Sequence, residues 1–465
     1  MTAPLGDLAQ IAPDAWLVGG ALRDRLLGRP TGDYDVVVAP DGGLEPVARA
    51  LKRATGGFAF ALSEAFGAWR VVAADRSWQL DLMPLEGGSV EADLARRDLT
   101  INAIAERIGG DGELVDPFGG LQDLRARRLR MVSPRAFAAD PLRTLRLARL
   151  VGELGFAAEA ETLNCARASA AGLRDVAAER IFSELKRMIT AQWALDGLAA
   201  MDATGVTEVV LPELSALRGV QQSRFHHLDV FEHTRAVLAE TIALQRDLEP
   251  VFGDNAPPLR AFLDAPLADE LTRGDALRFG ALLHDVAKPR TRQVTEAGRI
   301  TFMGHDRAGA ELAAAILERL RASDRLAQHV AALTRHHLRL GFLVHEMPLG
   351  RRSIYEYLDS CAPVAVDVTL LSVADRLATR GDNADRAIAK HLELAGQLLG
   401  EALSWAADPP RPPVRGDELA RALGIAPGPV IGDLLHELEE ASFAGEVAGR
   451  EQAIERAREL IERAG

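Results

Sequence analysis

The chain has 465 residues, enough for about three or four domains and too many for a single core. A net charge of −13 excludes a protein that coats nucleic acid over its whole surface. The sequence shows no signal-peptide pattern, no apolar run long enough to span a bilayer, and only two cysteines, Cys165 and Cys361. We therefore expect a soluble, mostly helical, cytoplasmic protein with no membrane partner and no disulfide framework.

The first informative segment pairs two glycines with two acids that follow one helix later. Its pattern predicts a strand at 16–18, a tight turn at Gly19 and Gly20, a helix at 21–27 and a second strand at Asp33–Val38. Glycines let a backbone approach a phosphate, and the start of the following helix presents free N–H groups to it. We expect a phosphate to lie at this turn.

Three aspartates are candidate metal ligands. Because residues i and i+2 of a strand point to the same face, Asp33 and Asp35 offer two carboxylates to one spot. Asp81 alternates with leucines in a predicted strand at 79–85, which buries the leucines and turns the aspartate to the other face. All eleven histidines lie after Phe225, so a metal in the first half must be held by carboxylates, which favours Mg²⁺ or Mn²⁺. Three such carboxylates fit a two-metal site for phosphoryl transfer, although a lone Asp-x-Asp pair is more often a solvated strand end.

Arginine-rich segments follow. The sequence ARRDLTINAIA predicts the start of a helix, with Arg96, Arg97 and Asp98 in its first turn. The sequence FAADPLRTLRLARL predicts a helix face that can contact the edge of a base and reach phosphates, through residues spaced by three: Asp140, Arg143, Arg146 and Arg149. Residues 125–187 hold thirteen Arg or Lys against seven Asp or Glu, a basic island that either binds phosphates or forms a solvated helix face.

The second half is equipped for a different metal, because eight histidines fall between His226 and His337. Adjacent His284 and Asp285 at a helix end can both reach one ion, which His233 and Asp375 can complete from other helices. We expect a second ion, or a phosphate, to be held by two further histidines, His305 and His336.

Chain breakers and composition divide the sequence into four parts. Residues 1–138 mix strand-like runs, including 68–73, with helices and predict a small α/β head. The pattern then becomes helical, with breakers that separate a neck at 139–218, a histidine-rich domain at 219–390 and a tail at 391–465. The tail predicts two helices joined through 424–429. The fold class is therefore α+β.

The segments GGALRD, GDYD, RRDLTINA, DPLRTLRLARL and AAERIFSEL occur in the order found in the class II tRNA nucleotidyltransferase and poly(A) polymerase family, which this chain resembles over nearly its whole length. The resemblance implies a nucleotidyltransferase head of the DNA polymerase β superfamily, with tRNA, CTP and ATP as partners and Mg²⁺ in the head. It implies that protein side chains select the base of the incoming nucleotide. It also implies roles for individual residues, with Asp33 and Asp35 on metal, Gly20 and Arg23 on the triphosphate, Arg97 on the nucleotide, Asp98 near its ribose, Asp140 and Arg143 on the base, and Arg146 and Arg149 on phosphates.

The segments FHHLDVFEHT, ALLHDVAKP, FMGHDRAGAE, LTRHHLRL and LLSVADRLA resemble the HD phosphohydrolase domain. The resemblance implies a second divalent metal, of a kind the sequence does not fix, and phosphomonoesterase or 2′,3′-cyclic phosphodiesterase activity. The tail resembles the family's segment that contacts the tRNA elbow, although it could equally be a dimerisation element, and the oligomeric state stays open.

Two departures from the family pattern bear on specificity. Ala139 stands where the base-reading motif usually has an acid, and only fourteen residues separate Asp81 from Arg96, where CCA-adding members carry a longer flexible loop. We therefore predict addition of two cytidines and weak addition of the terminal adenosine. The alternatives are full CCA addition, a poly(A) polymerase on the same scaffold, and an HD-type phosphohydrolase whose head only binds nucleotides.

Overall fold

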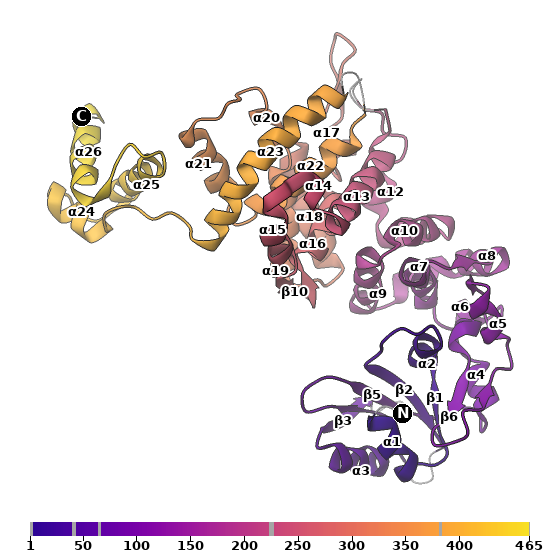
Figure 1. The fold of residues 1–465 in the computed structure, drawn as a ribbon. Helices are drawn as coiled ribbons and strands as arrows, with labels where there is room; N and C mark the ends of the chain where they lie inside the picture. The colour runs from indigo at the N-terminus through magenta and orange to yellow at the C-terminus, as the bar shows by residue number, and fades with distance from the viewer. Residues whose placement is uncertain (1–2, 40–42, 64–66, 223–226, 381–383, 465) are drawn as a thin grey trace. The chain divides into compact units, whose positions relative to one another are not determined.

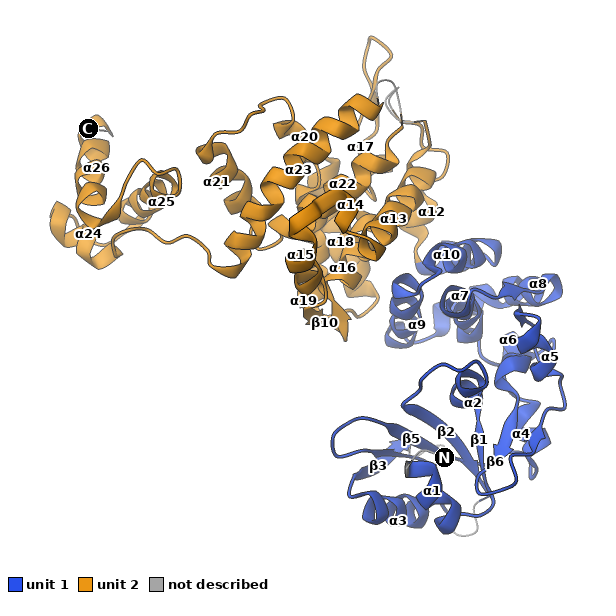
Figure 2. Ribbon diagram, viewed as in Figure 1, with its two compact units in different colours: residues 1–210 blue, residues 211–465 orange. Residues whose placement is uncertain are grey.

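The computed structural model describes residues 3–39, 43–63, 67–222, 227–380 and 384–464. The chain forms two compact units, Met1–Val210 and Leu211–Gly465, and each is described by itself (Figure 2). The division leaves the predicted head and most of the predicted neck in unit 1, and the histidine-rich domain and tail in unit 2.

Unit 1 begins with a seven-stranded sheet whose order is β3-β4-β5-β2-β1-β6-β7 (Figure 1). The strands are β1 Ala15–Val18, β2 Asp33–Val38, β3 Phe58–Ser63, β4 Ala68–Val72, β5 Gln79–Pro84, β6 Ala105–Arg107 and β7 Leu114–Val115. Only the β2–β5 pair is parallel among the described strand pairs of this sheet, and it places Asp35 opposite Asp81. Leu80 and Leu82 are fully buried, as predicted, because their faces alternate with that of Asp81.

Short helices cover this sheet. They are α1 Ala3–Ile11, α2 Gly19–Leu26, α3 Glu45–Thr55, α4 Val90–Leu94 and α5 Gly120–Arg125, with a 3₁₀ turn η1 at Thr100–Asn102. α3 packs on β3 and β4, and α2 packs on β1 and β2. α2 begins at Gly19, two residues earlier than expected, although Gly19 itself keeps a turn conformation with positive φ.

The helix predicted for the ARRDLTINAIA segment is wrong. The chain makes only η1 there and then pairs with β1 as β6. The Asp98 carboxylate accepts the backbone N–H of Leu99 and the side-chain amide of Asn102, at 2.7 and 3.0 Å. Such local contacts compete with helical hydrogen bonds, and the pairing with β1 completes the change.

The rest of unit 1 is helical. It comprises α6 Ala136–Ala139, α7 Leu142–Leu154, α8 Ala160–Ser169, η2 Ala170–Asp175, α9 Ala178–Thr190, α10 Ala194–Ala203 and α11 Val206–Val210, with a two-stranded β8 Arg128–Leu129 and β9 Ala157–Ala158. α7 packs against both α9 and α10 through a largely buried apolar side. This packing fixes the helix face on which the predicted base-reading residues lie.

Unit 2 is built around the packed helices α13 Val230–Arg246, α16 Arg273–Leu283, α19 Asp324–His336 and α22 Ala365–Ala378. α22 is buried along most of its length, and its buried residues include the polar Asp367, Thr369 and Ser372. Around this core lie α12 Pro212–Ser215, α14 Glu249–Phe252, η3 Gly253–Asn255, α15 Ala256–Leu263, α17 Lys288–Thr291, α18 His305–Arg319, α20 Arg339–Leu343, α21 Arg351–Ser360 and α23 Ala384–Ala407, with β10 Pro266–Ala268, β11 Leu271–Thr272, β12 Gln293–Val294 and β13 Ile300–Thr301.

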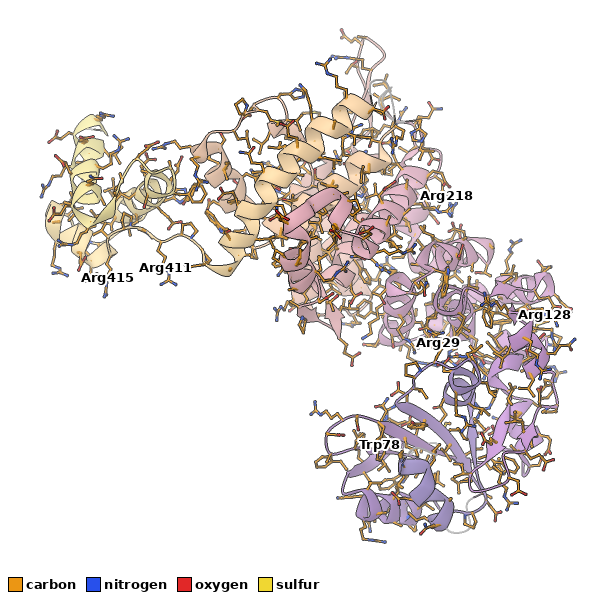
Figure 3. The ribbon with its side chains drawn as sticks, viewed as in Figure 1. Arg29, Trp78, Arg128, Arg218, Arg411 and Arg415 are labelled. Atoms are coloured by element: carbon orange, nitrogen blue, oxygen red, sulfur yellow. The ribbon has the colours of Figure 1, made fainter. Side chains whose placement is uncertain are left out.

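The tail has three helices where two were predicted: α24 Gly416–Leu423, α25 Pro429–Phe443 and α26 Gly449–Ala464. They share a core of their own that includes Leu419, Leu438 and Ala453. The extra boundary lies at Gly445, which takes positive φ two residues after the end of α25, and α26 then begins at Gly449. Arg411 and Arg415 lie on the segment that leads into α24 (Figure 3).

Both cysteines are free. Among the described residues no single helix is long and apolar enough to cross a membrane, and one bent pair, α21 with α22, passes that test only when the two are joined.

Candidate active sites

The carboxylates of unit 1 meet at the centre of the sheet. β2 carries Asp33 and Asp35, and β5 places Asp81 beside Asp35. Burial raises the pKa of Asp35, Asp81 and Asp33 raise it further, and the Arg97 guanidinium opposes the shift. Three acids that repel one another in a partly buried site fit a divalent cation, which would relieve the repulsion.

Gly19 brings the backbone against this cluster. It has a φ of +71°, and a Cβ there would lie 2.9 Å from Asp35 Oδ2 and 3.1 Å from Arg97 Nη1. Only glycine meets both demands, since the left-handed conformation and the missing side chain are each required. The start of α2 is thereby held next to the acids, as the phosphate hypothesis requires.

Asp81 has a partner that the sequence analysis missed. Arg70 of β4 donates from Nε and Nη2 to its two carboxylate oxygens, at 2.7 and 2.8 Å. The two residues are direct cross-strand neighbours. Asp81 is therefore already neutralised by an arginine, unlike Asp33 and Asp35.

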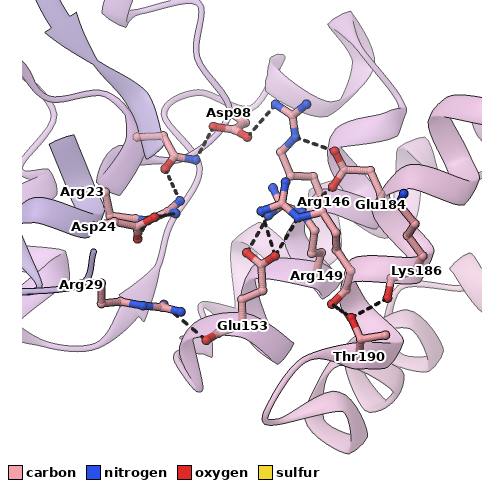
Figure 4. A network of polar contacts seen from close by, with 12 residues as sticks. Arg23, Asp24, Arg29, Asp98, Arg146, Arg149, Glu153, Glu184, Lys186 and Thr190 are labelled. Atoms are coloured by element: carbon pink, nitrogen blue, oxygen red, sulfur yellow. Dashed lines mark hydrogen bonds and ion pairs between the residues drawn. The ribbon is translucent and has the colours of Figure 1, made fainter. Parts of the chain in front are cut away.

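A chain of polar contacts links the head to the neck (Figure 4). Arg23 Nη1 donates to Asn102 Oδ1 at 2.8 Å, and Asn102 donates to Asp98. Asp98 in turn lies 3.5 Å from Arg146 Nη1. Burial would raise the pKa of Asp98, but Arg146 and the hydrogen bonds to the carboxylate outweigh burial and lower it. Asp98 is thus an anion that joins the two parts of unit 1.

The neck arginines are paired with acids. Arg146 and Arg149 both donate to Glu184 of α9, and Arg149 also donates to Glu153 at 2.6 Å. Arg143 Nη1 donates to the carbonyl oxygen of Ala136 at 3.1 Å. To bind a phosphate, Arg146 and Arg149 would have to contact it while remaining bonded to these acids.

Two adjoining cavities of unit 1 contain these groups. One, of about 520 Å³, is lined by polar residues that include nearly all the predicted head residues: Gly19, Gly20, Arg23, Asp33, Asp35, Asp81, Arg97, Asp98, Arg143, Arg146 and Arg149. The other, of about 790 Å³, shares Met83, Arg97 and Arg143 with it and is more apolar. The Asp140 carboxylate is turned to Arg180 of α9, 3.1 Å away.

Six groups of unit 2 converge to form a second site, which we call the histidine cluster: His233, His284, Asp285, His305, His337 and Asp375. Two subsets are arranged so that each could hold an ion, namely His233 with His284 and Asp375, and Asp285 with His305 and His337. The prediction for His336 is wrong. This residue lies outside the cluster, where its Nδ1 accepts a hydrogen bond from Arg339, because successive residues at the end of α19 point in different directions and only His337 faces inward.

The tautomers of the cluster are set by the backbone. The Nδ1 atoms of His284, His305 and His337 lie 2.9, 2.6 and 2.7 Å from backbone carbonyl oxygens, which accept only if Nδ1 carries the proton. The Nε2 atoms point away from these carbonyls, and those of His305 and His337 face each other at 3.3 Å. Burial lowers the pKa of His337 to about 4, so its ring is neutral, whereas Asp285 outweighs burial at His284 and raises its pKa. Imidazole nitrogens that meet beside the Asp285 carboxylate fit a metal ion, whose binding would release any proton on Nε2.

The histidine cluster opens into a cavity of about 820 Å³. Lys288 Nζ lies 2.7 Å from Asp285 and donates to Gln222. Ser372 and His391, on α22 and α23, are hydrogen-bonded to each other at the cavity wall. Sequence analysis found none of these four contact residues, and His226 of its histidine count lies outside the described residues.

Comparison with known proteins identifies the family of this chain and the domains in which both sites lie. Residues 75–130 match the model of the poly A polymerase head domain, 155–217 that of the probable RNA and SrmB-binding site of polymerase A, and 230–380 that of the HD domain. The A-adding tRNA nucleotidyltransferase of Deinococcus radiodurans is 38% identical over 452 residues, which cover 96% of this chain and 95% of the relative. The chain belongs to the tRNA nucleotidyltransferase and poly(A) polymerase family.

Other members of this family differ in the nucleotides that their names specify. The CC-adding tRNA nucleotidyltransferase of Thermus thermophilus is 34% identical, covering 95% of this chain and 92% of the relative. Among solved structures, a Thermotoga maritima CCA-adding enzyme complexed with tRNA is 19% identical with a TM-score of 0.62, covering 98% of this chain and 94% of that one. At that identity the likeness establishes the fold.

Proposed function

We propose that this tRNA nucleotidyltransferase family member transfers CMP or AMP from CTP or ATP to the 3′-hydroxyl of tRNA and releases pyrophosphate. The observation that carries the proposal is the polar cavity of unit 1, which gathers the three carboxylates, the Gly19 backbone and a set of arginines around one space. The names of the relatives support tRNA as the acceptor.

The three aspartates have different roles in this proposal. Asp33 and Asp35 would hold Mg²⁺, which supplies charge neutralisation at the triphosphate and lowers the pKa of the attacking hydroxyl. Asp81, held by Arg70, keeps its carboxylate in a fixed position beside Asp35. Arg97, between Gly19 and Asp93, is placed to contact the nucleotide.

The short segment after Asp81 supports addition of cytidines. After β5 it makes one turn at Gly87 and Gly88 and then α4, capped by Ser89, whose hydroxyl accepts the N–H of Ala92. Arg96 and Arg97 are tied by ion pairs to Glu86 and Asp93. This leaves no long loop that could move the base-reading residues between C and A. The A-adding relative, at 38% identity, favours addition of the terminal adenosine as the second candidate.

The histidine cluster supports a second activity, hydrolysis of a phosphomonoester or a 2′,3′-cyclic phosphodiester. The metal would be held by imidazole Nε2 atoms and the two aspartates and would polarise the ester phosphate. The mutually facing Nε2 atoms of His305 and His337, beside Asp285, are the observation that favours this activity.

One experiment tests the first proposal. The protein is incubated with tRNA that ends at the discriminator base, with CTP, ATP or both, and the product ends are sequenced. Addition limited to one to three nucleotides on tRNA supports the proposal. Long adenosine runs on any RNA would instead identify a poly(A) polymerase, and no extension would leave the head as a nucleotide-binding module.

A further inference from the structure

One face of α9 carries charges that are complementary to those on α7. Arg180, Glu184 and Arg187 lie at positions i, i+4 and i+7 and therefore on one side of the helix. Arg180 pairs with Asp140, Glu184 with Arg146 and Arg149, and Arg187 with Glu153. Each charge on this face of α9 thus meets an opposite charge on α7 or just before it.

Asp140 is the member of this set that the proposed function places on the base. It lies in extended conformation between α6 and α7. Its Oδ1 accepts the backbone N–H of Leu142 at 3.2 Å, and its Oδ2 accepts from Arg180 Nη2 at 3.1 Å. Two donors from different elements fix the carboxylate plane, and each oxygen keeps a second lone pair.

We propose that Arg180 is a positioning residue for base selection, which holds Asp140 so that its carboxylate accepts a hydrogen bond from the exocyclic amino group of the incoming base. The inference rests on the proposed function. Cytosine and adenine carry an amino donor at that edge, whereas uracil and guanine carry a carbonyl oxygen, which a carboxylate repels. Ala139 contributes no acid here, so Arg180 and the Leu142 N–H are the contacts that orient Asp140.

The pair contributes little to folding, because the Arg180 side chain is 53% exposed and exposed ion pairs add little stability. A loss of selectivity can therefore be separated from a loss of structure. The measurement is the ratio of kcat/KM for the preferred nucleotide to kcat/KM for UTP, on tRNA, with circular dichroism melts as the check on folding.

We expect Arg180→Gln to lower this ratio about tenfold, the effect of weakening one hydrogen bond to the base, with an unchanged melting temperature. The ratio for Arg180→Lys should lie between those of wild type and Arg180→Gln, because a lysine ammonium still donates to Asp140 but lacks the planar, two-pronged geometry of a guanidinium. If Arg180 acts through Asp140, the double variant with Asp140→Asn should show the same ratio as Asp140→Asn alone.

Arg187→Gln is the matched control for the selectivity ratio and not for absolute activity, because Arg187 lines the polar cavity. This variant removes the same charge from the same helix, at 54% exposure, and breaks another pair with α7. Its ratio should stay within about twofold of wild type, whatever happens to tRNA affinity. A wild-type ratio in Arg180→Gln, an equal drop in Arg187→Gln, or a double variant worse than Asp140→Asn would overturn the inference while transfer itself remains. Absence of transfer by the wild type would remove the proposed function and the inference together.

Discussion

Arg70 and Asp81 form a two-pronged ion pair across neighbouring strands, at 2.7 and 2.8 Å, directly beside Asp35. The arginine therefore lowers the negative potential of the carboxylate group. Arg70→Gln should raise affinity for Mn²⁺ severalfold in calorimetric titrations without nucleotide, because a positive charge leaves the neighbourhood of the metal. Unchanged or weaker Mn²⁺ binding would show that Arg70 is needed to shape the site.

Asp35→Ala should abolish nucleotide addition while tRNA binding survives, since the change removes a metal ligand and leaves the basic neck intact. Addition is followed by gel extension and binding by filter retention. Asp75→Ala, which removes an exposed carboxylate from the turn between β4 and β5, is the control and should retain addition. Near wild-type extension by Asp35→Ala would refute the assignment of the head site.

Asp285→Ala should leave addition intact and eliminate phosphatase or cyclic phosphodiesterase activity, because the two sites share no ligand. Bound metal, measured by elemental analysis, should fall in parallel. His336→Ala is the matched control, since its ring lies outside the histidine cluster, and it should keep the metal that His337→Ala loses. Loss of addition in a folded Asp285→Ala protein would contradict the separation of the sites.

His391 makes stability depend on pH. Burial lowers its pKa to about 4, against about 6.5 in the unfolded chain, and outweighs the opposing effect of Asp375. Below pH 6.5 His391 is protonated in the unfolded state but stays neutral in the folded state. Its contribution to the free energy of unfolding is therefore fully present at pH 7 and is lost as the pH falls toward 4. Between pH 7 and pH 5.5, His391→Gln should lose ~1 kcal/mol less unfolding free energy than wild type in urea titrations. Equal losses would show that the ring is not kept neutral.

The short segment between Asp81 and Arg96 predicts which nucleotides are added. We predict efficient addition of two cytidines and weak addition of the terminal adenosine, because one turn and α4 consume the segment. The test is ATP incorporation onto tRNA that already ends in CC, compared with CTP incorporation onto tRNA without CC. Robust incorporation of adenosine would favour the A-adding alternative and refute the argument from the short segment.

Sequence was sufficient for features set by local pattern. β5 follows from alternating apolar residues, and this alternation correctly predicts that Leu80 and Leu82 are buried on the face opposite Asp81. Partners that depend on strand register were out of reach, as Arg70 illustrates, because nothing local says that residues 70 and 81 are neighbours. The ARRDLTINAIA segment failed for a similar reason, since its strand exists only by pairing with β1.

The histidine cluster shows the same limit at the scale of one residue. The sequence analysis named five of the six cluster residues, but the choice between His336 and His337 depends on where α19 ends and how it is rotated. Arg180 lies in the AAERIFSEL motif, but its partner could not be predicted, because a charged residue on a half-exposed helix carries no sign of the acid that it will contact.

Gly19 and the charged face of α9 differ in how well they tolerate substitution. No side chain fits between Asp35 and Arg97 at Gly19, so mutation at that position can only damage catalysis. The ion pairs of Arg180 and Arg187 lie on half-exposed surface and can be exchanged at little energetic cost. Mutations on the surface of α9 can therefore change how strictly a base with an amino group is required, whereas the backbone beside the carboxylates tolerates no side chain.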